Sequence, residues 1–369
     1  MIKVLVVDDS AIVRDVLSSA IEKEADMELV GTAPDPFVAR DKIVRLKPDV
    51  ITLDIEMPRM DGLSFLERLM HYFPLPVIIV SSVTTHDPYA AVKALELGAF
   101  DVVNKPGGSI TVEEVKEEVL RKIRAAYEAG EKFIEQARRL SNVRIGSESR
   151  SLNAKRRSPS VGLAPHGSRA EAALLTQVRT TEKIIAIGAS TGGTVALEQI
   201  FRALPAHLYP IVVVQHMPPD FTRQFAGRLR ELSQLEVKEG EHEEILQAGT
   251  VYIAPGGYHM EIERRGASVF INLNQKERVH FQRPAVDVLF HSVAREVGKN
   301  ALGILLTGMG RDGAEGLLAM KKAGALTIAQ DEASSIVWGM PRAAIELGAA
   351  GKVVSLDQVP GEIISFTAE

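Results

Sequence analysis

The sequence predicts an α/β protein with two parallel-sheet regions joined by a polar segment. Short apolar runs alternate with amphipathic segments over most of the chain, which is the pattern of βα units with parallel strands. The alternation stops at about Tyr127 and resumes at Lys183, and 369 residues suit two domains better than one. We therefore expect a domain at 1–125, a flexible basic linker at 126–181 and a second domain at 182–369.

The first region indicates five βα units. Ser10 is well placed as the N-cap of a helix over 11–24. In a doubly wound parallel sheet, the ligand crevice lies at the carboxyl ends of the strands. The expected strands are 3–7, 28–32, 49–53, 77–81 and 100–104.

The middle segment is basic. Between Arg138 and Arg169 the chain has eight Lys or Arg residues and one acid, with Ser, Pro and Gly scattered among them. Such a composition buries too little apolar surface to fold alone, which favours a tether. A basic strip that docks an acidic partner or a nucleic acid is the alternative.

The second region restores the α/β pattern and predicts another parallel sheet. Helices are expected over 284–298 and 312–324. The expected strands are 183–188, 210–215, 250–255, 268–273, 301–306 and 325–330.

Composition excludes several kinds of protein. The chain has no cysteine, which excludes disulfides, thiolate catalysis and cysteine-ligated zinc. A net charge of −5 and a pI near 6.1 oppose a nucleic-acid role for the whole protein. The N-terminus lacks a signal-peptide core and no apolar run approaches the ~18 residues of a membrane span, so we expect a soluble, cytoplasmic protein.

Polar side chains mark the strand ends of the first region. Asp8 and Asp9 end its first strand and Asp54 ends its third, and these ends meet if the two strands are neighbours. Three carboxylates at one rim repel one another, and oxygen-only ligands suit Mg²⁺ as the cation that relieves the repulsion. Ser81 and Lys105, at the ends of the fourth and fifth strands, can contact an anion there. The set predicts a carboxylate that receives a phosphoryl group.

These residues carry a resemblance. The motifs VLVVDDS, LDIEMPRMDG, IIVSS and Lys105-Pro106 are similar to those of the receiver domain of bacterial response regulators, a flavodoxin-like fold, across 1–125. Val102 stands where that family often has an aromatic switch residue, and the resemblance implies a cis Lys105–Pro106 bond. The roles that it implies are phosphoacceptor for Asp54, Mg²⁺ ligands for Asp8, Asp9, Asp54 and the Glu56 carbonyl, and phosphoryl contacts for Ser81 and Lys105.

The stretch KIIAIGASTGGT places Ser190 in a Gly-x-Ser-x-Gly turn between an expected strand and an expected helix. Such a turn presents a serine nucleophile, and small neighbours let backbone N–H groups approach an oxyanion. A phosphate-binding turn and a simple helix start are the alternatives, although neither nucleotide-binding glycine fingerprint is present.

A serine nucleophile needs a base and an orienting acid. His216 directly follows an apolar run, and Asp312 lies in a glycine-rich turn after another, so we favour these two. The chain order Ser–His–Asp differs from the Ser–Asp–His order of α/β hydrolases and predicts a convergent arrangement on another fold. The alternatives are His259 for the base, and Asp287 and Asp331 for the acid.

The second region also carries a resemblance. IGASTGGT, VVVQHMPPDFTRQFAGRL, GTVYIAPGGYHM, VDVLF, LLTGMGRDGAEG and GMPRAA are similar to motifs in the catalytic domain of chemotaxis protein-glutamate methylesterases, the CheB family. The resemblance implies Ser190 as nucleophile, His216 as general base, Asp312 as its orienting partner and the Met309 N–H as an oxyanion donor. Two departures leave the triad in place: Arg311, where asparagine is common, and Gln282-Arg283-Pro284-Ala285, where His-Arg-Pro-Ser is frequent.

Members of that family hydrolyse glutamyl methyl esters on chemoreceptor helices, release methanol and often deamidate receptor glutamines. The resemblance therefore implies methylated chemoreceptor helices as substrate, the chemotaxis histidine kinase as phosphodonor, Mg²⁺ in the receiver and no cofactor for hydrolysis. The receiver would cover Ser190 until Asp54 is phosphorylated. The alternatives are a response regulator whose output domain binds nucleic acid, and a phosphorylation-controlled adaptor with a decayed hydrolase fold.

Overall fold

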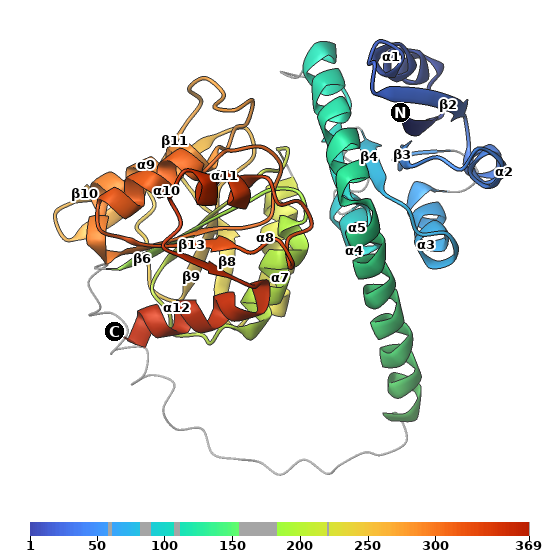
Figure 1. The fold of residues 1–369 in the computed structure, drawn as a ribbon. Helices are drawn as coiled ribbons and strands as arrows, with labels where there is room; N and C mark the ends of the chain where they lie inside the picture. The colour runs from blue at the N-terminus through green and yellow to red at the C-terminus, as the bar shows by residue number, and fades with distance from the viewer. Residues whose placement is uncertain (58–60, 82–89, 107–110, 155–182, 220, 369) are drawn as a thin grey trace.

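The computed structural model describes residues 1–57, 61–81, 90–106, 111–154, 183–219 and 221–368. They form two sheets of parallel strands, one in each region, and a separate two-stranded hairpin (Figure 1). The predicted class of two parallel α/β units is therefore confirmed. Within the described ranges, every helix is too short or too polar to cross a membrane.

The first sheet has the strand order β2-β1-β3-β4-β5. All neighbours are parallel, and β1 lies beside β3, so the carboxyl ends of these two strands meet. Ser10 caps α1 as expected, because its hydroxyl accepts from the Val13 N–H. The elements are β1 (Ile2–Val7), α1 (Ala11–Ile21), β2 (Met27–Ala33), α2 (Pro36–Leu46), β3 (Val50–Leu53), α3 (Gly62–Tyr72), β4 (Val77–Ser81), α4 (Ala90–Glu96) and β5 (Asp101–Asn104).

The next helix, α5 (Val112–Ala154), runs well past the expected end of the first domain. Ala126, Ala129 and Phe133 are buried in the core of the first region, and the Phe133 ring meets Phe100 edge to face at 5.3 Å. Apolar side chains on one face of the helix thus continue to reach the core beyond residue 125. This differs from the expected flexible linker at 126–181, of which 155–181 lies outside the described residues.

The second sheet has the order β14-β13-β12-β6-β7-β9-β8, again with parallel neighbours. Helices cover both faces: Ile200 and Phe225 belong to one core layer, and Leu289 and Leu317 to the other. The strands are β6 (Ile184–Ala189), β7 (Ile211–Gln215), β8 (Glu236–Glu239), β9 (Thr250–Ile253), β12 (Ala301–Leu305), β13 (Leu326–Gln330) and β14 (Lys352–Val354). The helices are α7 (Gly193–Ala203), α8 (Phe221–Leu232), α9 (Val286–Glu296), α10 (Ala314–Lys322), α11 (Met340–Glu346) and α12 (Val359–Ala368).

The expected strand at 268–273 lies outside this sheet. It is β11 (Ser268–Asn274), which pairs antiparallel with β10 (His259–Arg265) in the hairpin. Sequence periodicity missed β8, β10 and β14. The first and last are the two edge strands of the sheet and carry charged side chains, so they lack the apolar runs that mark central strands.

The two regions pack against each other through α4 and α5 of the first region. Phe221 and Val337 of the second region are buried in the core cluster of the first, and Val92 of α4 is buried in that of the second. Arg228 on α8 forms an ion pair at 2.7 Å with Glu96 at the end of α4. In Figure 1, α5 lies between the two sheets, so the first region covers one side of the second.

Candidate functional site

The predicted phosphoryl site lies at the carboxyl edge of the first sheet. Asp8 follows β1 and Asp54 follows β3, and both carboxylates are buried. Lys105 follows β5 and reaches across both: its Nζ lies 2.8 Å from Asp8 Oδ2 and 2.7 Å from Asp54 Oδ2. Asp9 belongs to the same group, since one carboxylate oxygen from each of the three acids lies within 4.8 Å of the others. The structure therefore brings four of the predicted residues together.

Burial governs the electrostatics of this rim. It raises the pKa of Asp54 to about 6, helped by the Asp8 charge and opposed by the Lys105 ammonium. Burial also acts to lower the pKa of Lys105, but the hydrogen bonds and charges of Asp54 and Asp8 outweigh it and raise that pKa. Three facing carboxylates with one ammonium are an oxygen-only donor set with unrelieved negative charge, which fits Mg²⁺.

The other predicted receiver residues lie around this rim. Ser81 is buried at the end of β4, opposite Asn104 of β5 in the sheet register. The Glu56 N–H donates to Asp54 Oδ1 at 3.1 Å, which puts Glu56 next to the predicted phosphoacceptor. The role of the Glu56 carbonyl as a metal ligand stays a prediction. Val102 is buried within β5. Among the described residues the cis peptide bond is Arg283–Pro284, so the expectation of a cis Lys105–Pro106 bond is wrong.

Ser190 lies in the tight turn between β6 and α7. Its N–H donates to the Thr307 carbonyl at 3.0 Å, and its carbonyl accepts from the Gly193 N–H at 2.7 Å and from Gln215 Nε2 at 2.9 Å. Gly192 adopts a φ of 78° at the start of α7, a conformation that favours glycine. The backbone on both sides of Ser190 is thereby fixed.

His216 and Asp312 form a hydrogen-bonded pair close to this turn. The His216 N–H donates to the Ala189 carbonyl at 3.0 Å, which sets His216 level with the Ser190 turn. His216 Nε2 lies 2.7 Å from Asp312 Oδ2, so Nδ1 is the ring nitrogen left for Ser190. No hydrogen bond joins the hydroxyl of Ser190 to His216 among the described side chains. Catalytic hydrogen bonds of this kind often tighten only when substrate binds.

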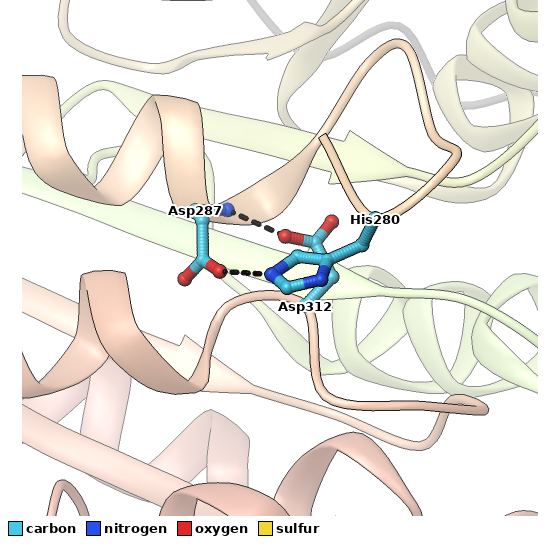
Figure 2. Close-up of side chains that lie close together, drawn as sticks. All are labelled: His280, Asp287 and Asp312. Carbon is cyan, nitrogen blue, oxygen red and sulfur yellow. Dashed lines mark hydrogen bonds and ion pairs between the residues drawn. The ribbon is translucent and has the colours of Figure 1, made fainter. Parts of the chain in front are cut away.

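The Asp312 carboxylate is almost completely buried, and both of its oxygens accept hydrogen bonds. Oδ2 accepts from the Val286 N–H at 2.7 Å. Oδ1 accepts from the Asp287 N–H at 2.9 Å, as Figure 2 shows. These are the first amides of α9, whose own N-cap, Ala285, offers no side-chain acceptor. Burial acts to raise the pKa of Asp312, but the His216 ring and the two amides outweigh it and lower that pKa. Asp312 is therefore an ionised acceptor for His216.

The alternative candidates have other contacts. His259 is buried, and its ring nitrogens pair with the Glu277 carbonyl at 2.9 Å and with a backbone N–H at 3.3 Å. Asp331 accepts from the N–H and hydroxyl of Ser334 and so caps a turn. Asp287 pairs with His280 instead of His216. Geometry therefore favours His216 as the base and Asp312 as its partner.

Ser190, His216 and Asp312 line one cavity of about 230 Å³. Met309 also lines it, and the Met309 N–H makes no hydrogen bond within the described part of the chain, which leaves that amide for an oxyanion. Helix α5 of the first region provides an opposite wall, with Glu114, Glu117, Glu118 and Arg121. The first region thus encloses the cavity that holds the candidate triad.

A polar contact that was not predicted from the sequence joins the two regions beside Ser190. The Thr191 hydroxyl donates to Asp101 Oδ2 at 2.5 Å, and Asp101 Oδ1 lies 2.8 Å from Lys122 Nζ. Lys122 also donates to the Val102 carbonyl at 2.7 Å. Thr191 and Lys122 are both buried. Because Asp101 and Thr191 lie 90 residues apart, no local pattern could indicate the pairing.

A doubly wound parallel-sheet region thus packs against a second parallel sheet, and a Ser, a His and an Asp of the second region line one cavity, which is the side-chain set of a serine hydrolase. The chain belongs to the CheB methylesterase family. Residues 185–363 match the family model for CheB methylesterase, and residues 4–117 match that for the response regulator receiver domain. The predicted enzyme class, a carboxylic-ester hydrolase, is confirmed by this membership.

Relatives match over nearly the whole chain. A protein-glutamate methylesterase/protein-glutamine glutaminase 2 from Syntrophus aciditrophicus (strain SB) is 50% identical over 363 residues, 98% of each chain. A protein-glutamate methylesterase/protein-glutamine glutaminase from Salmonella typhi is 47% identical over 364 residues, 99% of this chain and 96% of the relative. Among solved structures, the CheB methylesterase catalytic domain of Thermotoga maritima is 41% identical and covers 50% of this chain and 97% of its own, with a TM-score of 0.49.

Proposed function

We propose that this enzyme hydrolyses glutamyl methyl esters on the cytoplasmic helices of methylated chemoreceptors and is activated by phosphorylation of Asp54. Deamidation of particular receptor glutamines is its second reaction. The observation that carries the proposal is the single cavity in which Ser190, His216 and Asp312 meet, walled by a helix of the receiver region. The names of the relatives support the ester and amide chemistry.

The reaction is acyl transfer to Ser190. His216 Nδ1 takes the hydroxyl proton as the oxygen attacks the ester carbonyl, and the Met309 N–H donates to the resulting oxyanion. The imidazolium returns the proton to the departing methanol, and a water then hydrolyses the acyl-enzyme by the same route. Asp312 holds the ring tautomer and stabilises the imidazolium. A receptor glutamine would follow the same steps with ammonia as the leaving group.

The receiver controls access to this cavity. In the described state α5 encloses the triad and Asp101 holds Thr191, the residue after the nucleophile. Lys105 follows directly after β5, the strand that carries Asp101, and is paired with Asp8 and Asp54. A phosphoryl group on Asp54 would compete for Lys105, and a shift of β5 would reach Thr191 through Asp101.

Phosphorylation needs a metal and a phosphodonor. Asp8, Asp9, Asp54 and the Glu56 carbonyl would hold Mg²⁺, which when bound neutralises charge on the transferring phosphoryl oxygens. Asp54 would be the nucleophile, with Ser81 and Lys105 contacting the phosphoryl oxygens. The chemotaxis histidine kinase is the proposed phosphodonor, and the match of residues 4–117 to the response regulator receiver domain supports this.

Methanol release from methylated receptor membranes tests the proposal. The intact chain and Ser190→Ala are compared, each with and without a small-molecule phosphodonor and Mg²⁺. We expect release that depends on Ser190 and rises with the phosphodonor. Release that survives Ser190→Ala would overturn the assigned nucleophile, and release that ignores the phosphodonor would overturn receiver control.

A further inference from the structure

A second buried carboxylate lies beside Asp312, and the reaction above does not use it (Figure 2). Asp287, in the first turn of α9, is 4% exposed. We propose that Asp287 is a positioning residue, which fixes Asp312, and through it the His216 ring, by tying the start of α10 to the start of α9. The inference rests on the roles proposed above for Ser190, His216 and Asp312.

The two helices cap each other. Neither has a side-chain cap of its own, since the N-cap residues are Ala285 for α9 and Gly313 for α10. Asp312, just before α10, accepts from the first two amides of α9. Asp287, at the start of α9, accepts from the Gly316 N–H in the first turn of α10 at 2.6 Å. Each helix start is therefore satisfied by the carboxylate that belongs to the other.

This exchange closes a small ring of contacts around the catalytic aspartate. From the Asp312 side chain the ring passes to the Asp287 backbone, along the Asp287 side chain to the Gly316 amide, and back along the chain to Asp312. The helices are in close contact here: a Cβ on Gly316 would lie 2.6 Å from Phe290 Cβ and 3.1 Å from Asp287 Cα. A ring this short leaves the Asp312 carboxylate little freedom to turn away from His216.

Charge explains why the arrangement includes a histidine. Burial raises the pKa of Asp287, and the nearby Asp312 charge raises it further, whereas the Gly316 amide and His280 act to lower it. His280 Nε2 lies 3.0 Å from Asp287 Oδ2 (Figure 2), and His280 is the exposed member of the group. His280 thus offsets the repulsion between two buried carboxylates.

The three side chains could be taken for a metal site, because their ligand atoms lie within 4.8 Å of one another. All four carboxylate oxygens, however, already have hydrogen-bond partners: Oδ1 of Asp287 and both oxygens of Asp312 bond to backbone amides, and Oδ2 of Asp287 bonds to His280. A metal ion would have to displace these bonds. The contacts therefore fit a structural link between the starts of α9 and α10 better than they fit a metal site.

The test compares three variants of the full chain in methanol release from receptor membranes, with phosphodonor and Mg²⁺ present throughout. We expect Asp287→Ala to lower kcat about 10- to 100-fold through misplacement of the catalytic groups, with little change in KM. Asp287→Asn should retain most of the wild-type kcat, because its amide oxygen can still accept from Gly316. The matched control is Ser292→Ala, at another buried position on α9. It removes a hydroxyl that accepts from the Ile262 N–H.

A spectroscopic measurement separates positioning from loss of folding. The proton shared by His216 and Asp312 should give a downfield proton resonance that moves or broadens in Asp287→Ala and stays in place in Asp287→Asn and Ser292→Ala. If Asp287→Ala keeps the resonance and loses no more kcat than Ser292→Ala, the inference is wrong. If Ser190→Ala still releases methanol, the proposed function fails first, whatever the Asp287 variants do.

Discussion

Asp54 and Asp312 are both buried at the carboxyl edge of a parallel sheet, yet their surroundings shift their pKa values in opposite directions. Asp54 shares one ammonium with Asp8 and accepts one backbone amide, and burial raises its pKa to about 6. Asp312 accepts two amides at a helix start and a histidine ring, which lower its pKa despite burial. The number of donors, and not burial alone, decides the charge of a buried aspartate.

The comparison also separates their tasks. Asp54 retains negative charge that a cation or a phosphoryl transfer can use, so its surroundings suit a reacting group. Asp312 is fully hydrogen-bonded within the chain, so its surroundings suit a fixed orienting group. Substitutions of the two aspartates test this distinction, and a third, of Thr191, tests the contact between the two regions; the largest expected effect comes first.

Asp312→Asn should lower kcat for ester hydrolysis by roughly 10⁴-fold, because an amide group cannot hold the His216 tautomer in the same way. The measurement is methanol release at saturating receptor substrate. Asp331→Asn is the matched control, since Asp331 caps a turn elsewhere in the same region. Equal losses in the two variants would contradict the assignment of Asp312.

Asp54→Asn should stabilise the first region at neutral pH in metal-free buffer. A carboxyl whose pKa is raised by folding contributes stability below its unfolded pKa and loses it as pH rises through the folded value, here about 6. The asparagine variant should therefore match the wild type near pH 4 and exceed it by about 2 kcal/mol above pH 7. Native-state hydrogen exchange of the β3 amides measures the difference.

Asp41→Asn, at an exposed carboxylate on α2, serves as the control for this pH profile. It should show no comparable gain between pH 4 and pH 7. Asp54→Asn should also abolish stimulation by the phosphodonor while leaving basal methanol release measurable. A variant that is less stable than the wild type at neutral pH would show that Lys105 outweighs burial at this site.

Thr191→Val should raise methanol release by the unphosphorylated enzyme about fivefold. Loss of one hydrogen bond worth roughly 1 kcal/mol shifts the equilibrium between closed and open states by about that factor. The hydroxyl that bonds Asp101 is lost, while the shape of the side chain is nearly kept. The rate with phosphodonor should stay close to that of the wild type. Thr191→Ser, which keeps the hydroxyl, should behave as the parent. A fall in both rates would instead place the hydroxyl in the chemistry.

The parts of the site that the sequence predicted share a simple local signal. Each of these residues follows a buried apolar strand: Ser190, His216, Asp8, Asp54 and Lys105. A continuous apolar run followed by a polar residue was therefore enough to predict them. The central strands were found in the same way, to within one or two residues at most of their ends.

The parts that the sequence missed depend on contacts between distant segments. Asp287 was an alternative for the catalytic acid, but its bond to Gly316 follows from the packing of α9 on α10, which the sequence alone does not indicate. The continuation of α5 depends on Phe133 reaching the core of the first region, a contact that overrides the polar composition farther along. The edge strands β8 and β14 have too few buried side chains to give a pattern.

Thr191 lies beside the proposed nucleophile in one region and bonds to the other region, which gives that position two selective constraints at once. A substitution of Thr191 that an isolated hydrolase domain would tolerate would, in this chain, also weaken the contact with the receiver region. Asp101 and Lys122, on the receiver side of this contact, are constrained in the same way. The two halves of this chain should therefore exchange poorly between homologues by recombination, because a new first region must also match the turn that carries Thr191.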